Sequence, residues 1–134
     1  MRGMAFGGTI VTLALAGCIA TMPKEPTPTG AEDFATFCAS CHGADGKGKG
    51  AVAATMARAP ADLTRLPQGK DFPAARVMSK IYGYQGDAAA QAVMPEFGDL
   101  LEGETVLYDS GDGIPTPTPL RLVQLAEYIR ALPR

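Results

Sequence analysis

The sequence "CASCH" at residues 38–42 contains two of the chain's three cysteines and its only histidine. Just before and within it, aromatic and thiol side chains recur at the spacing of one helical face, at Phe34, Phe37, Cys38 and Cys41. Thr29 and Glu32 have the spacing of a helix capping box, so we expect a helix that begins near Thr29 and presents both thiols side by side. The four glycines of "GADGKGKG" (43–50) then predict its end.

Three chemistries use two cysteines at this spacing: a redox disulfide, a zinc site, and covalent attachment of haem. A redox pair belongs at a strand-to-helix junction of a parallel sheet, but the pattern before Cys38 is helical and no parallel sheet is predicted. Zinc needs three or four ligands, and the chain has no second cluster of cysteine or histidine to complete Cys38, Cys41 and His42. The motif C-x-x-C-H therefore favours haem, with both thiols bonded to the porphyrin and the histidine bound to iron.

The first 17 residues have the pattern of a secretory signal, with one positive charge at Arg2 and a short apolar run from Thr9 to Ala16. The run is too short to span a bilayer as a mature helix. The tetrapeptide "LAGC" (15–18) resembles the lipobox of bacterial lipoproteins, in which the signal is cut before a lipid-bearing cysteine. We therefore expect removal of residues 1–17 and lipidation of Cys18, with a plain signal peptide as the alternative. Two or three acyl chains would hold the protein stably on the periplasmic side of a bacterial membrane.

Residues 18–28 are rich in proline and threonine and predict an extended tether, which leaves residues 29–134 as one domain. Loss of the signal leaves 11 basic and 14 acidic residues, a net charge of −3, and nothing in this balance suggests nucleic acid. An exported chain reaches an oxidising compartment. However, a disulfide across the short loop between Cys38 and Cys41 would constrain little of the unfolded chain, so we expect a chemical role for the pair.

Two further helices are predicted. The first covers approximately residues 72–82, with Pro73 in its first turn and Val77, Met78 and Ile81 on one face. The second has Thr118 as its cap and Pro119 at its first position, followed by apolar residues at helical spacing to the chain end: Leu122, Leu125, Ala126, Ile129 and Leu132. Between these helices, "TVLYDSGDGI" (105–114) is compatible with a short hairpin around residues 110–113.

Several of these residues together resemble class I c-type cytochromes: Gly30, Phe34, Cys38, Cys41, His42, Leu125 and Tyr128. The resemblance covers residues 29–134 and implies an all-α fold, with three or more helices wrapped around one covalently bound haem c. It implies that Cys38 and Cys41 attach the haem and that His42 is the proximal iron ligand. It also implies that the small and aromatic residues of the first helix pack across those of the last, and that the Pro60 carbonyl orients His42.

Because His42 is the only histidine, a second imidazole from the same chain cannot ligate the iron. Met94, in "AVMPEFG" (92–98), looks like the methionine that supplies the distal sulfur in this family. Met78 is better explained as helix core, and Met56 lies close behind His42 in sequence. An open distal position, or another ligand, is the remaining alternative. Thioether sulfur favours Fe(II), so a His/Met pair would raise the reduction potential.

The expected function is therefore that of an electron carrier, not an enzyme, with redox proteins as donor and acceptor. A haem sensor or enzyme with an open distal site, and a fixed haem subunit of a larger oxidoreductase, are the alternatives. Segment 98–118 is acidic, whereas residues 43–80 carry an excess of basic side chains. The acidic segment is either a docking surface or a solvated loop.

Overall fold

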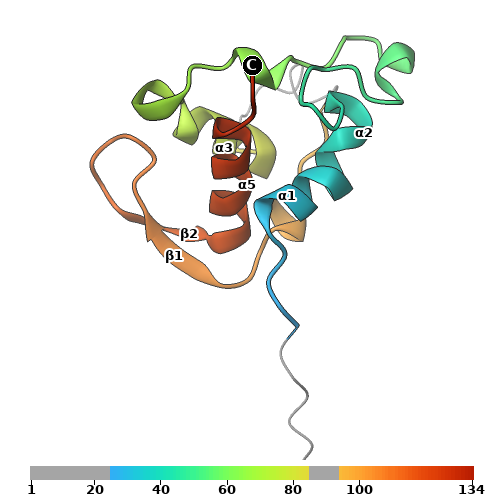
Figure 1. Ribbon diagram of the computed structural model, residues 1–134. Coiled ribbons are helices and arrows are strands. Elements are labelled where there is room, and N and C mark those ends of the chain that lie inside the picture. The colour runs from blue at the N-terminus through green and yellow to red at the C-terminus, as the bar shows by residue number, and fades with distance from the viewer. Residues whose placement is uncertain (1–24, 85–93) are drawn as a thin grey trace, which may run out of the picture.

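The computed structural model describes residues 25–84 and 94–134 (Figure 1). The expected signal peptide, Cys18 and most of the tether lie outside these residues. Residues 25–29 form an extended segment that runs away from the helical part of the chain (Figure 1). No helix in the described part is long and apolar enough to cross a membrane.

The N-terminal helix begins where the capping box predicts. Thr29 Oγ1 accepts from the backbone N–H of Glu32 at 3.3 Å, and the Thr29 N–H donates to the Glu32 carboxylate at 2.7 Å. The helix consists of α1 (Gly30–Asp33), a π-helical turn (Phe34–Cys38) and α2 (Ala39–His42). A π turn inserts one extra residue into a helix, and such turns are frequent at functional sites. The first residue of the cysteine motif ends this turn.

Helix α3 (Ala74–Tyr82) follows Pro73 and ends at Gly83, which adopts a left-handed conformation with φ of 102°. It begins two residues later than predicted because Phe72 and Pro73 are extended or irregular rather than helical. Its buried face includes Met78 and Ile81, whose side chains are only 6% and 3% exposed. Met78 is therefore a core residue, as predicted.

The fold is mainly helical but also contains a short two-stranded sheet, so the all-α prediction is confirmed only in part. Strand β1 (Thr105–Tyr108) pairs antiparallel with β2 (Thr116–Pro119), with Thr105 opposite Pro119 and Tyr108 opposite Thr116. The predicted turn residues 110–113 lie in the connecting loop, but the second strand begins beyond the predicted stretch. The Tyr108 hydroxyl donates to Glu127 Oε1 at 2.5 Å and so links the hairpin to the last helix.

Helix α5 (Leu120–Arg130) starts later than predicted, because the residues expected to cap it belong to β2. The Thr118 hydroxyl donates to the Thr116 carbonyl and does not cap the helix. Pro119 is the last residue of this edge strand. Proline has no backbone N–H, and at this position its absence removes no hydrogen bond from the sheet. The Leu120 N–H instead donates to the Glu104 carbonyl at 2.7 Å.

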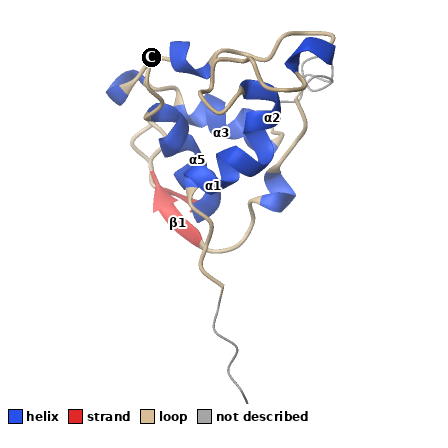
Figure 2. Cartoon of the chain, turned by 45° about the vertical axis from the view of Figure 1, so that its right-hand side comes forward, coloured by secondary structure: helices blue, strands red, loops and turns tan. Residues whose placement is uncertain are grey.

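The N-terminal helix crosses α5 at very short range (Figure 2). A Cβ atom added to Gly30 would lie 2.0 Å from the Gln124 carbonyl oxygen, so only glycine permits this approach. Next to the crossing, the rings of Phe34 and Tyr128 pack with their centroids 5.2 Å apart. The predicted contact between the first and last helices is confirmed, and it forms the centre of the core together with Leu125, which is 1% exposed.

Gly30→Ala should therefore destabilise the fold, because neither backbone at the crossing can yield without separating the helices. Overpacking of this kind costs about 1–3 kcal/mol or more. Urea unfolding of the purified protein would measure the loss, with Ala31→Gly, an exposed neighbour in the same helical turn, as a control for backbone effects. An unchanged unfolding midpoint for Gly30→Ala would mean that the two helices do not meet as described.

Candidate functional site

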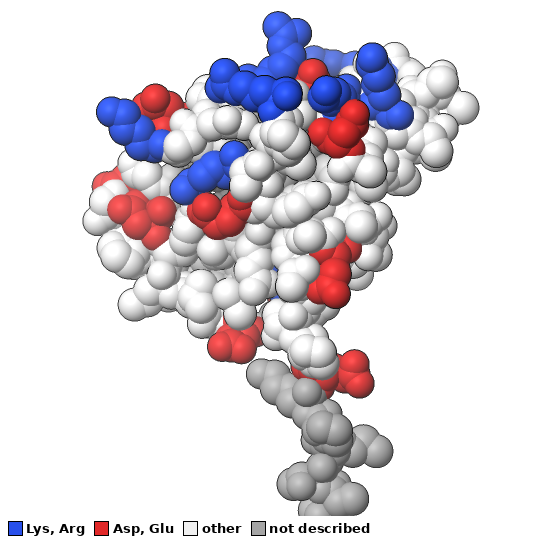
Figure 3. Space-filling view, in the orientation of Figure 1, with Lys and Arg blue, Asp and Glu red and all other residues white. Residues whose placement is uncertain are grey.

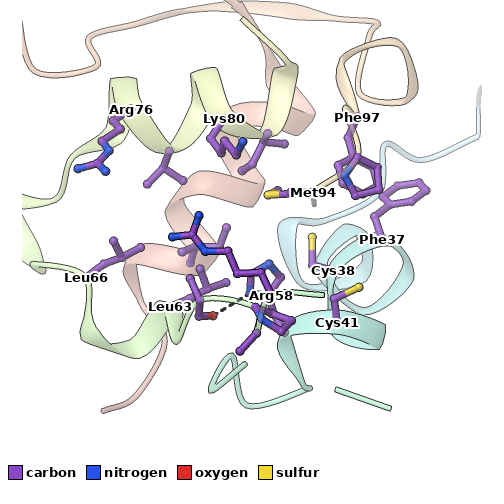
Figure 4. Close-up of a pocket in the computed structure, with 18 of the residues that line it drawn as sticks. Phe37, Cys38, Cys41, Arg58, Leu63, Leu66, Arg76, Lys80, Met94 and Phe97 are labelled. Atoms are coloured by element: carbon purple, nitrogen blue, oxygen red, sulfur yellow. Dashed lines mark hydrogen bonds between the residues drawn. The ribbon is translucent and has the colours of Figure 1, made fainter. Parts of the chain in front are cut away.

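A cavity of about 570 Å³ lies between the N-terminal helix, α3, α5 and the loops of residues 56–66 and 94–97 (Figure 4). Its volume is in the range of cofactor and small-molecule pockets. Most of its wall is apolar, with Leu63, Leu66, Val77, Ile81 and Ile129 among the lining residues. The four predicted site residues of the domain, Cys38, Cys41, His42 and Met94, all line this one cavity.

The two cysteines enter the cavity from the N-terminal helix. Cys38 is 6% exposed and Cys41 is half-buried, and both are free thiols. Burial, followed by the nearby charge of Asp33, raises the pKa of Cys38 to about 11. A redox dithiol reacts through a thiolate whose pKa is lowered, so this environment is the wrong one for disulfide exchange. The only sheet in the described residues is the antiparallel hairpin, which also lacks the setting of a thioredoxin-like motif.

The zinc alternative also lacks its ligands. Within residues 25–84 and 94–134, no group of three or more Cys, His, Asp or Glu side chains is placed to hold a metal ion. The two thiols and the imidazole of the motif therefore do not converge on a common point, although they line the same cavity.

His42 is held in one orientation by the loop that follows the 3₁₀ turn at Ala53–Thr55. Its side chain is buried, and its Nδ1 lies 2.9 Å from the Ala61 carbonyl oxygen. An N–H at Nδ1 donates to this oxygen, which leaves the lone pair on Nε2 available for a metal. The prediction that Pro60 would supply this carbonyl is wrong by one residue.

The glycine-rich segment 43–50 fixes the backbone of the motif. The Gly48 N–H donates to the His42 carbonyl at 2.7 Å, and the Gly50 N–H donates to the Cys41 carbonyl at 3.0 Å. Gly48 has φ of 75°, and a Cβ there would lie 2.4 Å from the Pro60 carbonyl oxygen. Glycine therefore allows the loop to pass between the end of α2 and the segment that holds His42.

Met94 points into the cavity, and Figure 4 shows its sulfur above the space beside Cys38. The residues after it are anchored, since the Phe97 N–H donates to the Ile81 carbonyl at 2.9 Å and its ring packs 5.9 Å from that of Phe37. Met56 also lines the cavity, which its position in the sequence did not predict. Met78 does not line it. Of the described residues, two thus bring thioether side chains to the same pocket.

Three basic side chains, Arg58, Arg76 and Lys80, line the cavity, and none of the lining residues within 25–84 and 94–134 is acidic. The sequence contained a signal for them in the basic excess of residues 43–80, but not their convergence on the site. Figure 3 shows that Lys and Arg gather at the upper end of the molecule, whereas most of the Asp and Glu in view lie lower. In Figure 1 this upper end is formed largely by the loops of residues 43–72.

The sequence model of the family described as Cytochrome c matches residues 28–106 of this chain. The chain belongs to the cytochrome c family. It therefore binds haem c covalently and takes part in haem-based electron transfer, as members of this family typically do. No curated protein and no solved structure matches the chain. The match ends within β1, so α5, which packs on α1 in this cytochrome c, lies beyond the matched range.

The cavity of this cytochrome c fits its cofactor. It offers two thiols on one wall for thioether bonds, an oriented imidazole, and thioether sulfurs as soft iron ligands. Apolar walls limit the access of water to the metal, and this limits stabilisation of the more highly charged ferric state.

Proposed function

We propose that this cytochrome c is a one-electron carrier in which Cys38 and Cys41 attach the haem, His42 is the proximal ligand and Met94 the distal ligand. The observation that carries the proposal is the convergence of all four side chains on one ligand-sized cavity, although Met94 lies 52 residues after His42 in the sequence. When bound, haem c supplies an iron that cycles between Fe(II) and Fe(III).

The chain's own residues account for the rest of the mechanism. The Ala61 carbonyl keeps Nδ1 of His42 protonated and directs Nε2 to the metal. A neutral sulfur from Met94 favours the ferrous state and closes the distal position to substrates. Redox proteins are the donor and acceptor of the electron, as the family implies. The basic side chains around the cavity would attract a partner whose contact surface is negatively charged. They support such a partner more strongly than the acidic segment 98–118 supports a partner with a positively charged surface.

The attachment is tested by the double variant Cys38→Ala/Cys41→Ala. Without either thiol no thioether can form, so the denatured chain should lack the mass of the haem. The matched control is Cys18→Ala, which removes the third cysteine and should retain the mass of one haem. Mass spectrometry of the denatured proteins separates these cases, and a double variant that still carries covalent haem would show that the assignment is wrong.

We propose further that residues 1–17 are a signal peptide, that Cys18 carries lipid, and that residues 18–28 tether the domain to the periplasmic side of a bacterial membrane. The lipobox resemblance supports this. The extended segment at residues 25–29 supports it too, because it emerges from the end of the molecule that lies opposite the basic upper end (Figures 1 and 3).

Cys18→Ala should move the protein from the membrane fraction to the soluble fraction while leaving the haem domain folded. Lipid and haem are carried by separate cysteines, so one function should be lost without the other. Detergent partitioning and the visible spectrum measure the two properties independently. A variant that stays in the detergent phase would show that another segment anchors the protein.

A further inference from the structure

The cavity has two chemically different ends. Cys38 and Cys41 stand at one end, and Figure 4 shows Arg76 at the end away from them, on the same side as Leu66. Arg76 belongs to the first turn of α3, and its side chain is exposed except where it lines the cavity. Lys80 lies one turn further along the same helix, and Arg58 approaches from the opposite loop.

The cofactor also has two chemically different edges, which match the two ends of the cavity. Haem c has its thioether bonds on one edge of the porphyrin and its two propionate carboxylates on the opposite edge. A porphyrin bonded to Cys38 and Cys41 therefore directs its carboxylates toward the far end of the cavity. A guanidinium group presents a planar set of N–H donors that matches a carboxylate in a bidentate pair.

We propose that Arg76 binds a haem propionate and that this ion pair helps to set the reduction potential. The inference rests on the proposed attachment through Cys38 and Cys41. The pair supplies a positive charge near a carboxylate whose negative charge would otherwise stabilise the ferric state. It also stabilises the ionised form of the propionate and so lowers the pKa of that carboxyl group.

Arg76→Gln should therefore lower the reduction potential at neutral pH, because the propionate charge is no longer compensated. It should also raise the propionate pKa, so the pH range in which the potential varies with pH should move upward by about 1–3 units. Among the residues that the structure describes, the other charged groups that line the cavity are Arg58 and Lys80.

Redox titration of the haem-loaded protein between about pH 4 and 8 tests the proposal. Arg65→Gln is the matched control, since it removes one positive charge from an exposed residue of the same basic surface that does not line the cavity. Arg76→Lys, which keeps the charge but not the bidentate geometry, should give an intermediate result. Arg76→Glu should lower the potential further than Arg76→Gln.

Equal effects of Arg76→Gln and Arg65→Gln on the potential and on its pH dependence would overturn the inference. The haem mass of the denatured chain and the visible spectrum of each variant are read in the same samples. If the wild type carried no covalent haem, the proposed function would fail instead, so the two failures are distinguishable. Because Arg76 is exposed, unfolding is not expected, and thermal unfolding of each variant verifies that the fold is kept.

Discussion

Met94→Ala should keep the haem covalently attached and leave its distal face open to water or an added ligand. The thioether bonds and His42 are untouched by the change, whereas the sulfur that points into the cavity is lost. The reduction potential should fall, since a ligand that prefers Fe(II) is removed and water entering the pocket favours the ferric state. Carbon monoxide added to the ferrous variant should bind readily, while the wild type should hardly bind it.

Two other methionines provide controls for this experiment, Met78 in the core and Met56 in the cavity. Met78→Ala should leave carbon monoxide binding at the wild-type level and cost about 2–5 kcal/mol of stability as a core truncation. Met56→Ala removes the second sulfur of the cavity and should also leave the iron closed. If Met56→Ala opened the site and Met94→Ala did not, Met56 would be the distal ligand. Ready binding by the wild type would mean an open distal site, and a sensor or enzyme would then replace the carrier.

Arg121→Ala should lower the free energy of unfolding by about 3–5 kcal/mol, the cost of removing one partner from a buried ion pair. Asp33 of α1 is 2% exposed and accepts two hydrogen bonds from the Arg121 guanidinium, one of them at 3.0 Å. The same guanidinium donates to the Leu100 carbonyl at 2.6 Å. Arg121 thus joins the first helix, the start of α5 and the loop that follows the Met94 segment.

Urea unfolding of the wild type and of Arg121→Ala measures this loss of stability. The double variant Asp33→Leu/Arg121→Met is the appropriate comparison, because replacing both members of a buried pair with apolar groups is often close to neutral. It should recover most of the stability lost in Arg121→Ala. A loss below about 1 kcal/mol for the single variant would class the contact as an ordinary surface ion pair.

Local signals in the sequence predicted the elements that they determine directly. The capping box located the start of the first helix. The contact of Gly30 and Phe34 with the last helix was predicted from the resemblance to class I c-type cytochromes instead. The start of α5 was misplaced because a threonine followed by proline suits the end of an edge strand as well as a helix start. The choice between them depends on the pairing of β2 with β1, a contact between segments that local sequence does not encode.

The residues of the candidate site divide in the same way, into those that local sequence predicts and those that only the fold brings together. The motif at residues 38–42 predicted the two thiols and the imidazole, because their chemistry depends on spacing within one helix. Ala61, Met56 and Arg76 could not be assigned from sequence, since loops far from the motif bring them to the cavity. The Leu63 N–H, for example, donates to the Gly46 carbonyl at 2.8 Å, and this contact helps to bring the Ala61 carbonyl to His42.

A redox-titrated visible spectrum of the purified protein tests the central claim most directly, because one experiment reports haem type, spin state and potential together. The account predicts a c-type spectrum that is low-spin and six-coordinate in both oxidation states, with a single one-electron transition at the raised potential of His/Met ligation. A high-spin or five-coordinate ferrous spectrum would contradict it.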